Sequence, residues 1–381
     1  MAQGHEVTVL TKQFDCSSEV DEQLPCRVIR SGAKRDLLFS FWAAKWLLKQ
    51  QVREKFDIVH VHGFEGLLVG WARKTVPRRI PPIVLSIHTL RRYQFEQYRK
   101  YGASTSCRRV QGMLSEEESK ALLRGFNTVE RRSLIMEPFL CNAVDMIVPV
   151  ADYLAMEINR VYGIPGERIH PVLNGVRVRE PSNQSADIRK RLLIDKGTQL
   201  ILYVGRMELT KGCHDLIAAF RLLKSHRKQA VKLLFIGTGG GLKALRALVE
   251  RLGLSEDVVF MGHVPHNEVF SYYSVSDLFV LPSYSEGMPK VLLEAMASGC
   301  PTVVSDIDAH RSVIEPNVTG YLFRTGDVDN LASVIQSALC DEGREKIISK
   351  AKRTVRDNYT WEAVAKRLEI VYMRLLGLQC G

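Results

Sequence analysis

LFVLPSYSEGMPKVLLE, residues 278–294, has the pattern of a strand, a loop and a helix in succession. Its first five residues form a short apolar run of the kind found in the buried strands of parallel sheets. The loop turns at Gly287, and Pro289 indicates a first helical turn, where a residue without an N–H group costs nothing. We therefore expect the repeating unit of a wound α/β sheet.

The same alternation of β-rich runs and helical spacing extends in both directions from this unit. A polar stretch at 181–185 divides the pattern into two halves, each with its own strands. We predict an α/β fold with two Rossmann-like domains, 1–180 and 181–360, whose parallel sheets face each other across a cleft. Residues 361–381 are expected to form a C-terminal helix that returns to the first domain. The expected strands are 5–11, 26–30, 57–62, 83–87 and 145–150 in the first domain, and 199–205, 231–237, 258–262, 278–282 and 301–305 in the second.

Composition agrees with two folded domains and excludes several classes of protein. The chain has 381 residues, 46% hydrophobic and 25% charged, so it can bury ordinary cores and is not intrinsically disordered. Its apolar runs are far shorter than the ~20 residues of a membrane helix, and no cleavable leader is visible, so we expect a soluble, cytoplasmic protein. The 8 cysteines form no Cys-x-x-Cys pair, which argues against a zinc site or a disulfide framework. The net charge of +11 suits anionic ligands or an anionic membrane and gives no reason to expect nucleic acid.

Two segments of the first domain depart from the regular pattern. Residues 91–140 contain many charges and few strand formers, and we interpret them as a helical insertion beside the cleft. Residues 34–55 place large apolar side chains at helical spacing, with Lys45, Lys49 and Arg53 between them. Two interpretations of this helix stay open, because a half-buried helix and a helix on an anionic membrane share this pattern. A core helix packed on 57–62 is the simpler one.

Two carboxylates separated by seven residues frame the loop after 278–282. Glu286 lies at the carboxyl edge of the predicted sheet and Glu294 lies further along the helix, so both could face one ligand. The unpaired N–H groups and the positive dipole end of this helix would form a ready site for a phosphate. Carboxylates beside a phosphate pocket require hydroxyl donors, and sugars supply them. The simpler alternative is that Glu286 caps the helix and Glu294 is solvated.

A second strand-to-helix turn carries basic residues. GRMELTKG, residues 205–212, places Arg206 and Lys211 at a strand end, where Arg as a planar fork and Lys as a point charge could bind a diphosphate. These cations would neutralise a nucleotide leaving group without a metal, although a solvated basic turn has the same sequence. The glycines at 237–241 are weaker evidence, because they lack the spacing of a dinucleotide-binding loop.

Three histidines follow strands of the first domain. His88 comes directly after 83–87, and His60 and His62 alternate at the end of 57–62. Histidines beyond the carboxyl ends of parallel strands point into the cleft, where a near-neutral pKa suits contact with a substrate hydroxyl. A metal site at the His-x-His pair is disfavoured, since no third ligand lies at a useful spacing.

Four motifs resemble those of the retaining nucleotide-sugar glycosyltransferases of the GT-B fold, family 4. They are VLNGV at 172–176, GRMELTKG at 205–212, EGMPKVLLEAMASGCPTVVSD at 286–306 and VTGYLF at 318–323. The resemblance covers nearly the whole chain and is strongest from Leu200 to Phe323. It implies a donor-binding C-terminal domain and an acceptor-binding N-terminal domain. From the position of the insertion at 91–140 beside the cleft, we expect it to help choose the acceptor.

The resemblance also implies roles for individual residues. Glu286 would contact the donor sugar and Glu294 the ribose hydroxyls, while Arg206 and Lys211 would hold the diphosphate and stabilise it as it leaves. His88 would contact the sugar near its reacting end. No metal or cofactor is expected, because these cations and a helix terminus meet the charge of the leaving group. The expected catalytic residues are His88, Glu286, Arg206 and Lys211, and the expected donor-binding residues are Gly205, Arg206, Lys211, Asn174, Gly237, Val264, Glu286, Gly287, Met288, Lys290, Val291 and Glu294.

Two departures from the family pattern affect these expectations. Relatives begin with an extra strand and a Gly-rich loop, whereas this sequence starts directly before 5–11. We therefore expect a gap in the first sheet, with either a truncated sequence or a partly lost site. The segment 306–311 replaces the usual Gly-Gly-x-Pro-Glu turn. Asp306-Ile307-Asp308 matches the D-x-D motif of metal-dependent transferases. Asp306 fits the end of a strand, however, and we interpret the match as coincidental.

The sequence thus predicts a retaining hexosyltransferase of polysaccharide biosynthesis, in peripheral contact with an anionic membrane. It would move a sugar from a UDP-sugar to a hydroxyl of a glycan or lipid-linked acceptor. Two other functions stay open. One is a nucleotide-sugar-binding protein with little transferase activity, as a result of the gap in the first sheet. The other is a GT-B epimerase, which would convert a nucleotide sugar with no acceptor present.

Overall fold

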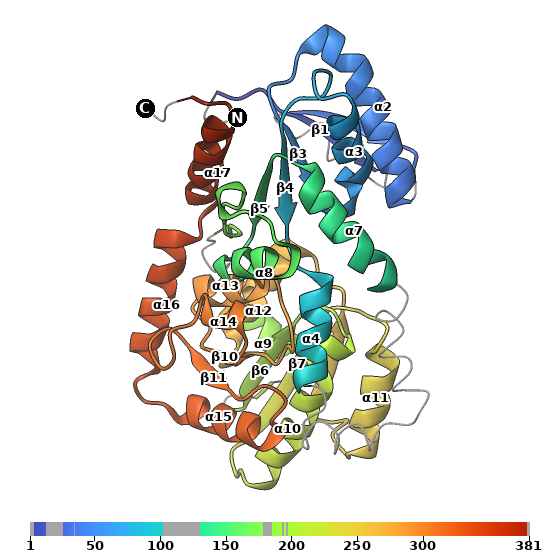
Figure 1. Ribbon diagram of the computed structural model, residues 1–381. Helices are drawn as coiled ribbons and strands as arrows, with labels where there is room; N and C mark the ends of the chain where they lie inside the picture. The colour runs from blue at the N-terminus through green and yellow to red at the C-terminus, as the bar shows by residue number, and fades with distance from the viewer. Residues whose placement is uncertain are drawn as a thin grey trace.

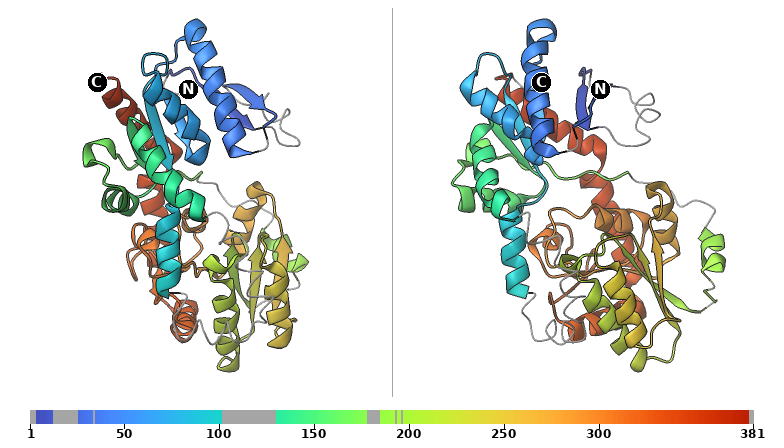
Figure 2. Two further views of the ribbon diagram at one scale, coloured as in Figure 1. Left: turned by 45° about the vertical axis from the view of Figure 1, so that its right-hand side comes forward. Right: turned by 90° about the vertical axis from the view of Figure 1, so that its right-hand side faces the viewer.

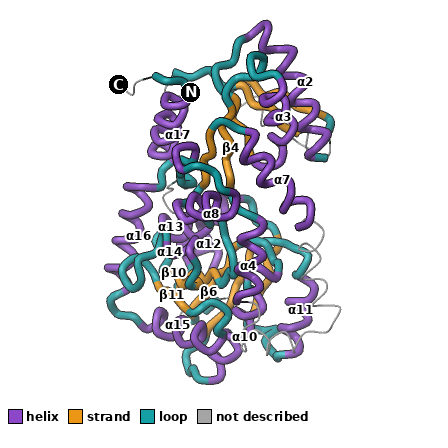
Figure 3. Tube along the Cα trace, viewed as in Figure 1, coloured by secondary structure: helices purple, strands orange, loops and turns teal. Residues whose placement is uncertain are grey.

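The chain folds into two α/β domains, seen one above the other in Figure 1. In each domain the strands, orange in Figure 3, lie between helices. All ten expected strands are present, so the predicted fold class is confirmed, and β11 (Tyr321–Phe323) adds a strand that the sequence did not predict. This computed structural model describes residues 4–12, 26–33, 35–101, 130–177, 185–192, 194–195 and 197–378.

The C-terminal domain contains one parallel sheet in the order β11-β10-β9-β6-β7-β8. Counted from the first strand of the domain this is the order 3-2-1-4-5-6 of a doubly wound sheet. The central strands QLILYV and LFVL are apolar and buried because helices cover both faces of the sheet. The strands are β6 (Gln199–Val204), β7 (Val231–Ile236), β8 (Val258–Gly262), β9 (Leu278–Leu281), β10 (Thr302–Ser305) and β11. The helices are α9 (Ser185–Arg191), α10 (Cys213–Ser225), α11 (Leu242–Arg251), α12 (His266–Val275), α13 (Lys290–Ser298), α14 (Asp308–Arg311), α15 (Val328–Cys340) and α16 (Arg344–Asn358).

The N-terminal strands form two parallel sheets where the sequence predicted one. One sheet pairs β1 with β2, and the other has the order β3-β4-β5, with no ladder between β1 and β3 in the described part of the chain. In the right-hand view of Figure 2, β1 and β2 stand apart from the other three strands. The strands are β1 (Thr8–Lys12), β2 (Arg27–Ser31), β3 (Val59–His62), β4 (Ile83–Ile87) and β5 (Met146–Pro149), and the helices are α2 (Asp36–Glu54), α3 (Leu67–Thr75), α4 (Arg91–Tyr101), α7 (Glu130–Ala143) and α8 (Asp152–Tyr162).

Helix α2 joins the two N-terminal sheets. It packs on α3 and on the short turn Gly63–Gly66, and it also contacts β1. Lys12 at the end of β1 bonds to Asp36 of α2 and to Glu65 of that turn, the latter at 3.1 Å. The helix buries Phe39 and Leu47 but leaves other apolar side chains exposed, so neither simple interpretation of residues 34–55 describes it fully.

The C-terminal helix α17 (Trp361–Leu375) crosses from the C-terminal domain to the N-terminal one. It begins where the Thr360 side chain accepts a hydrogen bond from the amide of Ala363. Val364 and Val371 pack against Val84 and other residues of the β3-β4-β5 sheet. None of the described helices is both long and apolar enough to cross a bilayer.

The described ends of the predicted insertion are helical. Helix α4 runs from the N-terminal domain along the C-terminal one in both views of Figure 2, and α7 leads into β5. On α4, the hydroxyl of Tyr93 donates to Asp308 of α14 at 2.5 Å, so this helix fastens one domain to the other. Residues 102–129 of the insertion and 178–184 of the predicted domain boundary lie outside the described residues.

Candidate active site between the two domains

The topology of the C-terminal sheet determines where a ligand can bind. The strand order reverses between β6 and β9, so the loops after these two strands diverge at the carboxyl edge. Open α/β sheets bind ligands in the crevice at such a reversal. The loop after β6 carries Arg206 and Lys211, and the loop after β9 carries Glu286 and Gly287. The strongest candidates from the sequence therefore come from the two loops that border this crevice.

Lys211 and Glu286 meet across the crevice. The Nζ of Lys211 donates to Oε1 of Glu286 at 2.7 Å, and the Ser283 hydroxyl donates to the same oxygen at 2.7 Å. The side chains of the pair are only 13% and 12% exposed. Burial by itself raises the pKa of Glu286, but the charge and hydrogen bond of Lys211 outweigh it and lower that pKa. The site thus holds a buried ion pair whose cation could turn to an incoming anion.

Buried polar residues support this pair from behind. The hydroxyl of Tyr284 donates to Asp215 at 2.5 Å, and the amide of Tyr284 donates to the Thr210 carbonyl at 2.9 Å, so the two loops are tied together. His310 is fully buried, its Nδ1 lies 2.8 Å from the Ser305 carbonyl oxygen, and burial lowers its pKa to about 4. The sequence analysis missed these roles, although His310 lies in the segment that departs from the family pattern.

Two glycines of the loop after β7, of which Gly237 was predicted for the donor site, allow adjacent loops to approach closely. A Cβ on Gly237 would lie 2.0 Å from the carbonyl oxygen of Gly205, and one on Gly239 would lie 2.5 Å from that of Met207. Gly237 also has a φ of 129°, which L side chains rarely adopt. These contacts press the loop after β7 directly against the loop that carries Arg206 and Lys211.

Arg206 is not part of the buried pair. Its side chain is 67% exposed and forms a 2.7 Å bond with Glu208. The backbone of Arg206 is fixed, because its carbonyl accepts from the Tyr203 hydroxyl at 2.8 Å. The two side chains predicted to bind the diphosphate therefore differ in position. Lys211 is already inside the crevice, and Arg206 lies at its rim.

Glu294 occupies a second polar pocket on α13. It is 5% exposed, with Oε1 at 2.8 Å from His266 Nε2 and Oε2 at 3.3 Å from the Tyr273 hydroxyl. His266 and Tyr273 are seven residues apart on α12 and face the same carboxylate. The sequence analysis missed both, although a spacing of seven places two residues on one helix face. Glu286 and Glu294 thus have different environments: Glu286 is in an ion pair with Lys211, and Glu294 contacts the Tyr273 hydroxyl and His266.

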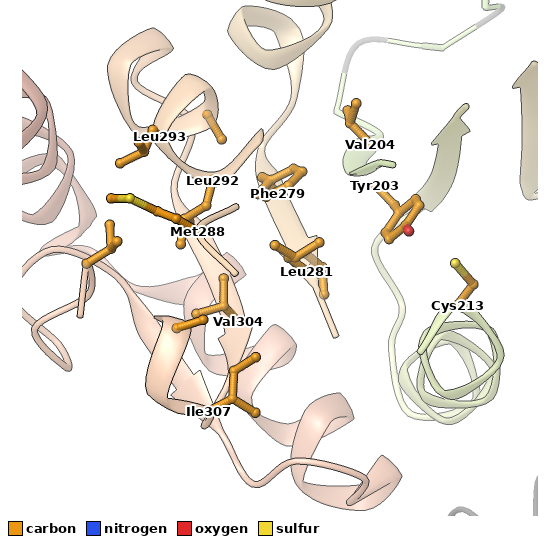
Figure 4. Packing of buried hydrophobic residues seen from close by; sticks show 14 of the residues in the cluster. Tyr203, Val204, Cys213, Phe279, Leu281, Met288, Leu292, Leu293, Val304 and Ile307 are labelled. Atoms are coloured by element: carbon orange, nitrogen blue, oxygen red, sulfur yellow. The ribbon is translucent and has the colours of Figure 1, made fainter. Parts of the chain in front are cut away.

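Helix α13 presents its N-terminus to the crevice. Pro289 is the N-cap with a φ of −76°, and Gly299 ends the helix with a φ of 77°. The Nζ of Lys290 lies 5.5 Å from the centre of the Trp361 ring, and its charge contributes to the lowered pKa of His62 and of His88. Val291 and Val264 are half-buried. In Figure 4, Met288 lies in the core with Leu292 and Leu293, so its side chain anchors the loop.

Histidines of the N-terminal domain form the opposite wall. Nδ1 of His62 lies 3.1 Å from Nε2 of His88, and the two rings stack at 5.4 Å. His60 lies behind them, bonded to the Tyr372 hydroxyl of α17 at 2.5 Å and to Ser86 at 2.7 Å. Burial lowers the pKa of His62 and His88 and lowers that of His60 to about 3. All three rings are therefore neutral near pH 7.

The loop after β9 is in contact with the N-terminal domain. A Cβ on Gly287 would lie 1.6 Å from the carbonyl oxygen of His88. Asn174 forms two hydrogen bonds with Met288, both at 3.2 Å. Its backbone N–H donates to the sulfur Sδ, and its side-chain Nδ2 donates to the backbone carbonyl. The structure thus brings His88, Asn174, Gly287 and Met288 together around the loop after β9.

The two carboxylates of the Asp306-Ile307-Asp308 sequence have different partners. Asp306 pairs with Arg311, and Asp308 accepts from Tyr93. Among the described residues there is no group of three or more His, Cys, Asp or Glu side chains suited to hold a metal ion.

Comparisons with known proteins agree with this architecture. Residues 1–180 match the model of Glycosyltransferase Family 4, and residues 184–355 match that of Glycosyl transferases group 1. An uncharacterized glycosyltransferase of Methanocaldococcus jannaschii is 28% identical over 98% of this chain and 92% of its own length. A D-inositol 3-phosphate glycosyltransferase of Xylanimonas cellulosilytica is 26% identical over 97% and 87%.

Solved structures share the fold over almost the whole chain. Sucrose-phosphate synthase from Thermosynechococcus elongatus matches with a TM-score of 0.76 and 22% identity, over 99% of this chain and 90% of that one. Anabaena HepE in complex with UDP and glucose matches with a TM-score of 0.73 and 18% identity, over 97% and 92%. Together with the two family models, which meet at the boundary between the domains, these matches identify the chain as a GT-B glycosyltransferase with a Glycosyltransferase Family 4 domain and a Glycosyl transferases group 1 domain.

Proposed function

We propose that this glycosyltransferase is a retaining, metal-independent hexosyltransferase that uses a UDP-sugar and a hydroxyl of a glycan or lipid-linked acceptor. The buried Lys211–Glu286 pair beside the N-terminus of α13 carries the proposal. It supplies a cation and unpaired N–H groups for a diphosphate, with a carboxylate for sugar hydroxyls. The complexes of HepE with UDP and with UDP-glucose support uracil as the base of the donor.

The residues of the crevice suggest how the reaction proceeds. Lys211 turns from Glu286 to the diphosphate as the donor binds, and Arg206 closes over it from the rim. Glu286 is then free to accept from a donor hydroxyl, and neutral His88 contacts the sugar near its reacting carbon. The bond from that carbon to the phosphate oxygen breaks while the acceptor oxygen bonds to it on the same face. The leaving phosphate takes the acceptor proton, and Lys211, Arg206 and the helix terminus stabilise its charge.

Donor binding is the first test of this proposal. Thermal unfolding with a panel of UDP-, GDP- and ADP-sugars should give a shift with UDP-sugars. Glu294→Ala should raise the Kd of the same donor about 10- to 100-fold, because hydrogen bonds to a charged group contribute roughly 1.5–3 kcal/mol. Glu268→Ala, on the exposed side of α12, is the matched control. No shift with any nucleotide sugar, or an undiminished shift with Glu294→Ala, would count against the proposal.

A binding protein with little transferase activity is the second candidate. The break between β1 and β3 favours it, since it lies in the domain that would hold the acceptor. Donor binding without turnover, on an acceptor panel that includes glycans, lipid-linked sugars and D-inositol 3-phosphate, would support this candidate over the first.

We further propose that α2 holds the enzyme on an anionic membrane. Phe41 is 60% exposed, Leu37 and Leu38 lie beside it on the surface, and Lys45 and Lys49 follow on the exposed side. Inserted apolar side chains and basic residues together favour an anionic lipid surface.

Sedimentation at low salt should recover the protein with phosphatidylglycerol vesicles and leave it free with phosphatidylcholine vesicles. Leu38→Ser with Phe41→Ser should reduce recovery about tenfold or more, since each side chain contributes roughly 1.5–3 kcal/mol when buried. Met156→Ser, an equally exposed apolar position on α8, should have no effect; equal losses in both variants would exclude a specific role for α2.

A further inference from the structure

The geometry points to Tyr153 as the residue that sets the anion-binding orientation of the loop after β9. It is a positioning residue supplied by the N-terminal domain to a phosphate site in the C-terminal domain. The inference rests on the proposed function in one respect, that the anion is the diphosphate of the donor.

Tyr153 reaches across the domain boundary to two successive carbonyl groups. It lies in the first turn of α8, and it is buried. Its hydroxyl oxygen is 2.5 Å from the carbonyl oxygen of Glu286 and 2.9 Å from that of Gly287. Since a phenol has one proton, the two carbonyls share a single donor, and both must face it.

Peptide geometry converts this contact into an orientation of N–H groups. In a trans peptide the C=O of one residue and the N–H of the next point in opposite directions, and the described chain contains no cis peptide. A Glu286 carbonyl turned toward Tyr153 therefore turns the N–H of Gly287 away from it. The Gly287 carbonyl does the same for the N–H of Met288.

Both N–H groups remain available for an anion. Neither donates to a backbone carbonyl in the part of the chain that the structure describes. They precede α13, whose first turn also has unpaired N–H groups, so the positive ends of two peptide dipoles join the positive end of a helix. Lys211 lies against the side chain of Glu286, the residue before Gly287 in this loop. The loop thus combines N–H groups that have no backbone acceptor in the described chain with a neighbouring cation.

A third contact completes the hold on the loop. Asn174 Nδ2 donates to the Met288 carbonyl, so three successive carbonyls have a side-chain donor. The peptide after Met288 ends in Pro289, which has no N–H. Asn174 therefore restrains the loop but turns no donor toward the anion, and Tyr153 has a role that Asn174 lacks.

The hydroxyl of Tyr153 is held as a donor. Burial, and after it the charge of Glu286, raises the pKa of Tyr153, so the phenol stays protonated at any physiological pH. Its ring packs 5.4 Å from that of Tyr93, whose hydroxyl bonds to Asp308. Both tyrosines come from the N-terminal domain, and both donate to the C-terminal domain. The phosphate site is consequently complete only when the two domains are in contact.

The test measures binding against the number of phosphates in the probe. Tyr153→Phe keeps the ring and removes the donor, so the two peptides lose the restraint on their orientation. Calorimetry with uridine, UMP and UDP should show the Kd of UDP raised about 10- to 100-fold, that of UMP raised less, and that of uridine within twofold of the wild type. Tyr162→Phe is the matched control, because it removes a 2.6 Å bond from the same helix to Glu137 outside the crevice. It should leave all three constants unchanged.

Two results would overturn the inference. One is an unchanged Kd of UDP in Tyr153→Phe, and the other is an equal loss for uridine and UDP, as expected of a merely structural residue. The failure of the proposed function gives a different result, since the wild type would then bind no UDP at all.

Discussion

Lys211→Ala should lower kcat at saturating donor by about 10²- to 10³-fold, the usual cost of removing one group that stabilises charge in the transition state. The reason is the position of Lys211, a cation with 13% of its side chain exposed that already faces the crevice. A buried charge acts through a lower effective dielectric than an exposed one, so it is worth more to a leaving diphosphate. Loss of Arg206, which lies at the rim, should lower kcat less than loss of Lys211.

The same substitution should reverse the response of stability to pH at Glu286. In the wild type the pKa of Glu286 is lowered, so its contribution to stability is present above the unfolded pKa of ~4.3 and is lost as the pH falls through the folded value. Without Lys211, burial dominates and raises that pKa. The folded state then retains a proton that the unfolded state releases, and stability decreases as the pH rises above ~4.3.

Single-turnover kinetics and denaturant unfolding between pH 4 and pH 8 would check both effects. Lys211→Arg keeps the charge and should recover part of the activity. Lys224→Ala is a matched control, because it breaks an ion pair with Asp257 at the C-terminal end of α10. Intact turnover in Lys211→Ala would show that the assigned role in leaving-group stabilisation is wrong.

The sequence predicted the architecture well because the relevant signals are local. Each of the strands β6 to β10 is a mainly apolar run of four to six residues followed by a loop and a helix, whereas β11, with three residues, was not predicted. That pattern fixes a doubly wound sheet and, through the strand order, the crevice between β6 and β9. The division of the N-terminal strands into two sheets is a property of pairing between strands, and no single run reveals it.

The site was predictable only where its chemistry lies in consecutive residues. Glu286, Glu294 and Lys211 belong to short motifs, and the structure places Glu286 and Lys211 together before α13 and Glu294 within that helix. The partners that define their state come from distant segments. His266 reaches Glu294 from another helix, and Tyr153 contacts a loop 133 residues away in the sequence. Such contacts arise from packing of helices and domains, which the spacing of residues within one motif does not encode.

Gly287→Ala should lower kcat/KM by about 100-fold or more while leaving the folded domains intact. A Cβ at this position would lie 1.6 Å from the His88 carbonyl oxygen, where ordinary van der Waals contact begins at 3.4 Å. The φ of Gly287 is outside the left-handed region, so the substitution causes a steric clash between domains and no backbone strain. The domains must move apart, and His88 and Tyr153 then lose their places beside the loop.

Separating the domains should affect chemistry more than donor binding. Glu294 and Lys211 belong to the C-terminal domain and stay in place, so the Kd of UDP should rise less than kcat falls. Closure is the step that brings reacting groups from two domains together, and it contributes through orientation. Small-angle scattering with UDP should show a more extended shape for Gly287→Ala than for the wild type. Gly166→Ala is the control, since a Cβ there meets nothing within 4 Å. A Gly287→Ala enzyme with normal kcat would mean that the reacting state does not require this contact between the loop and His88.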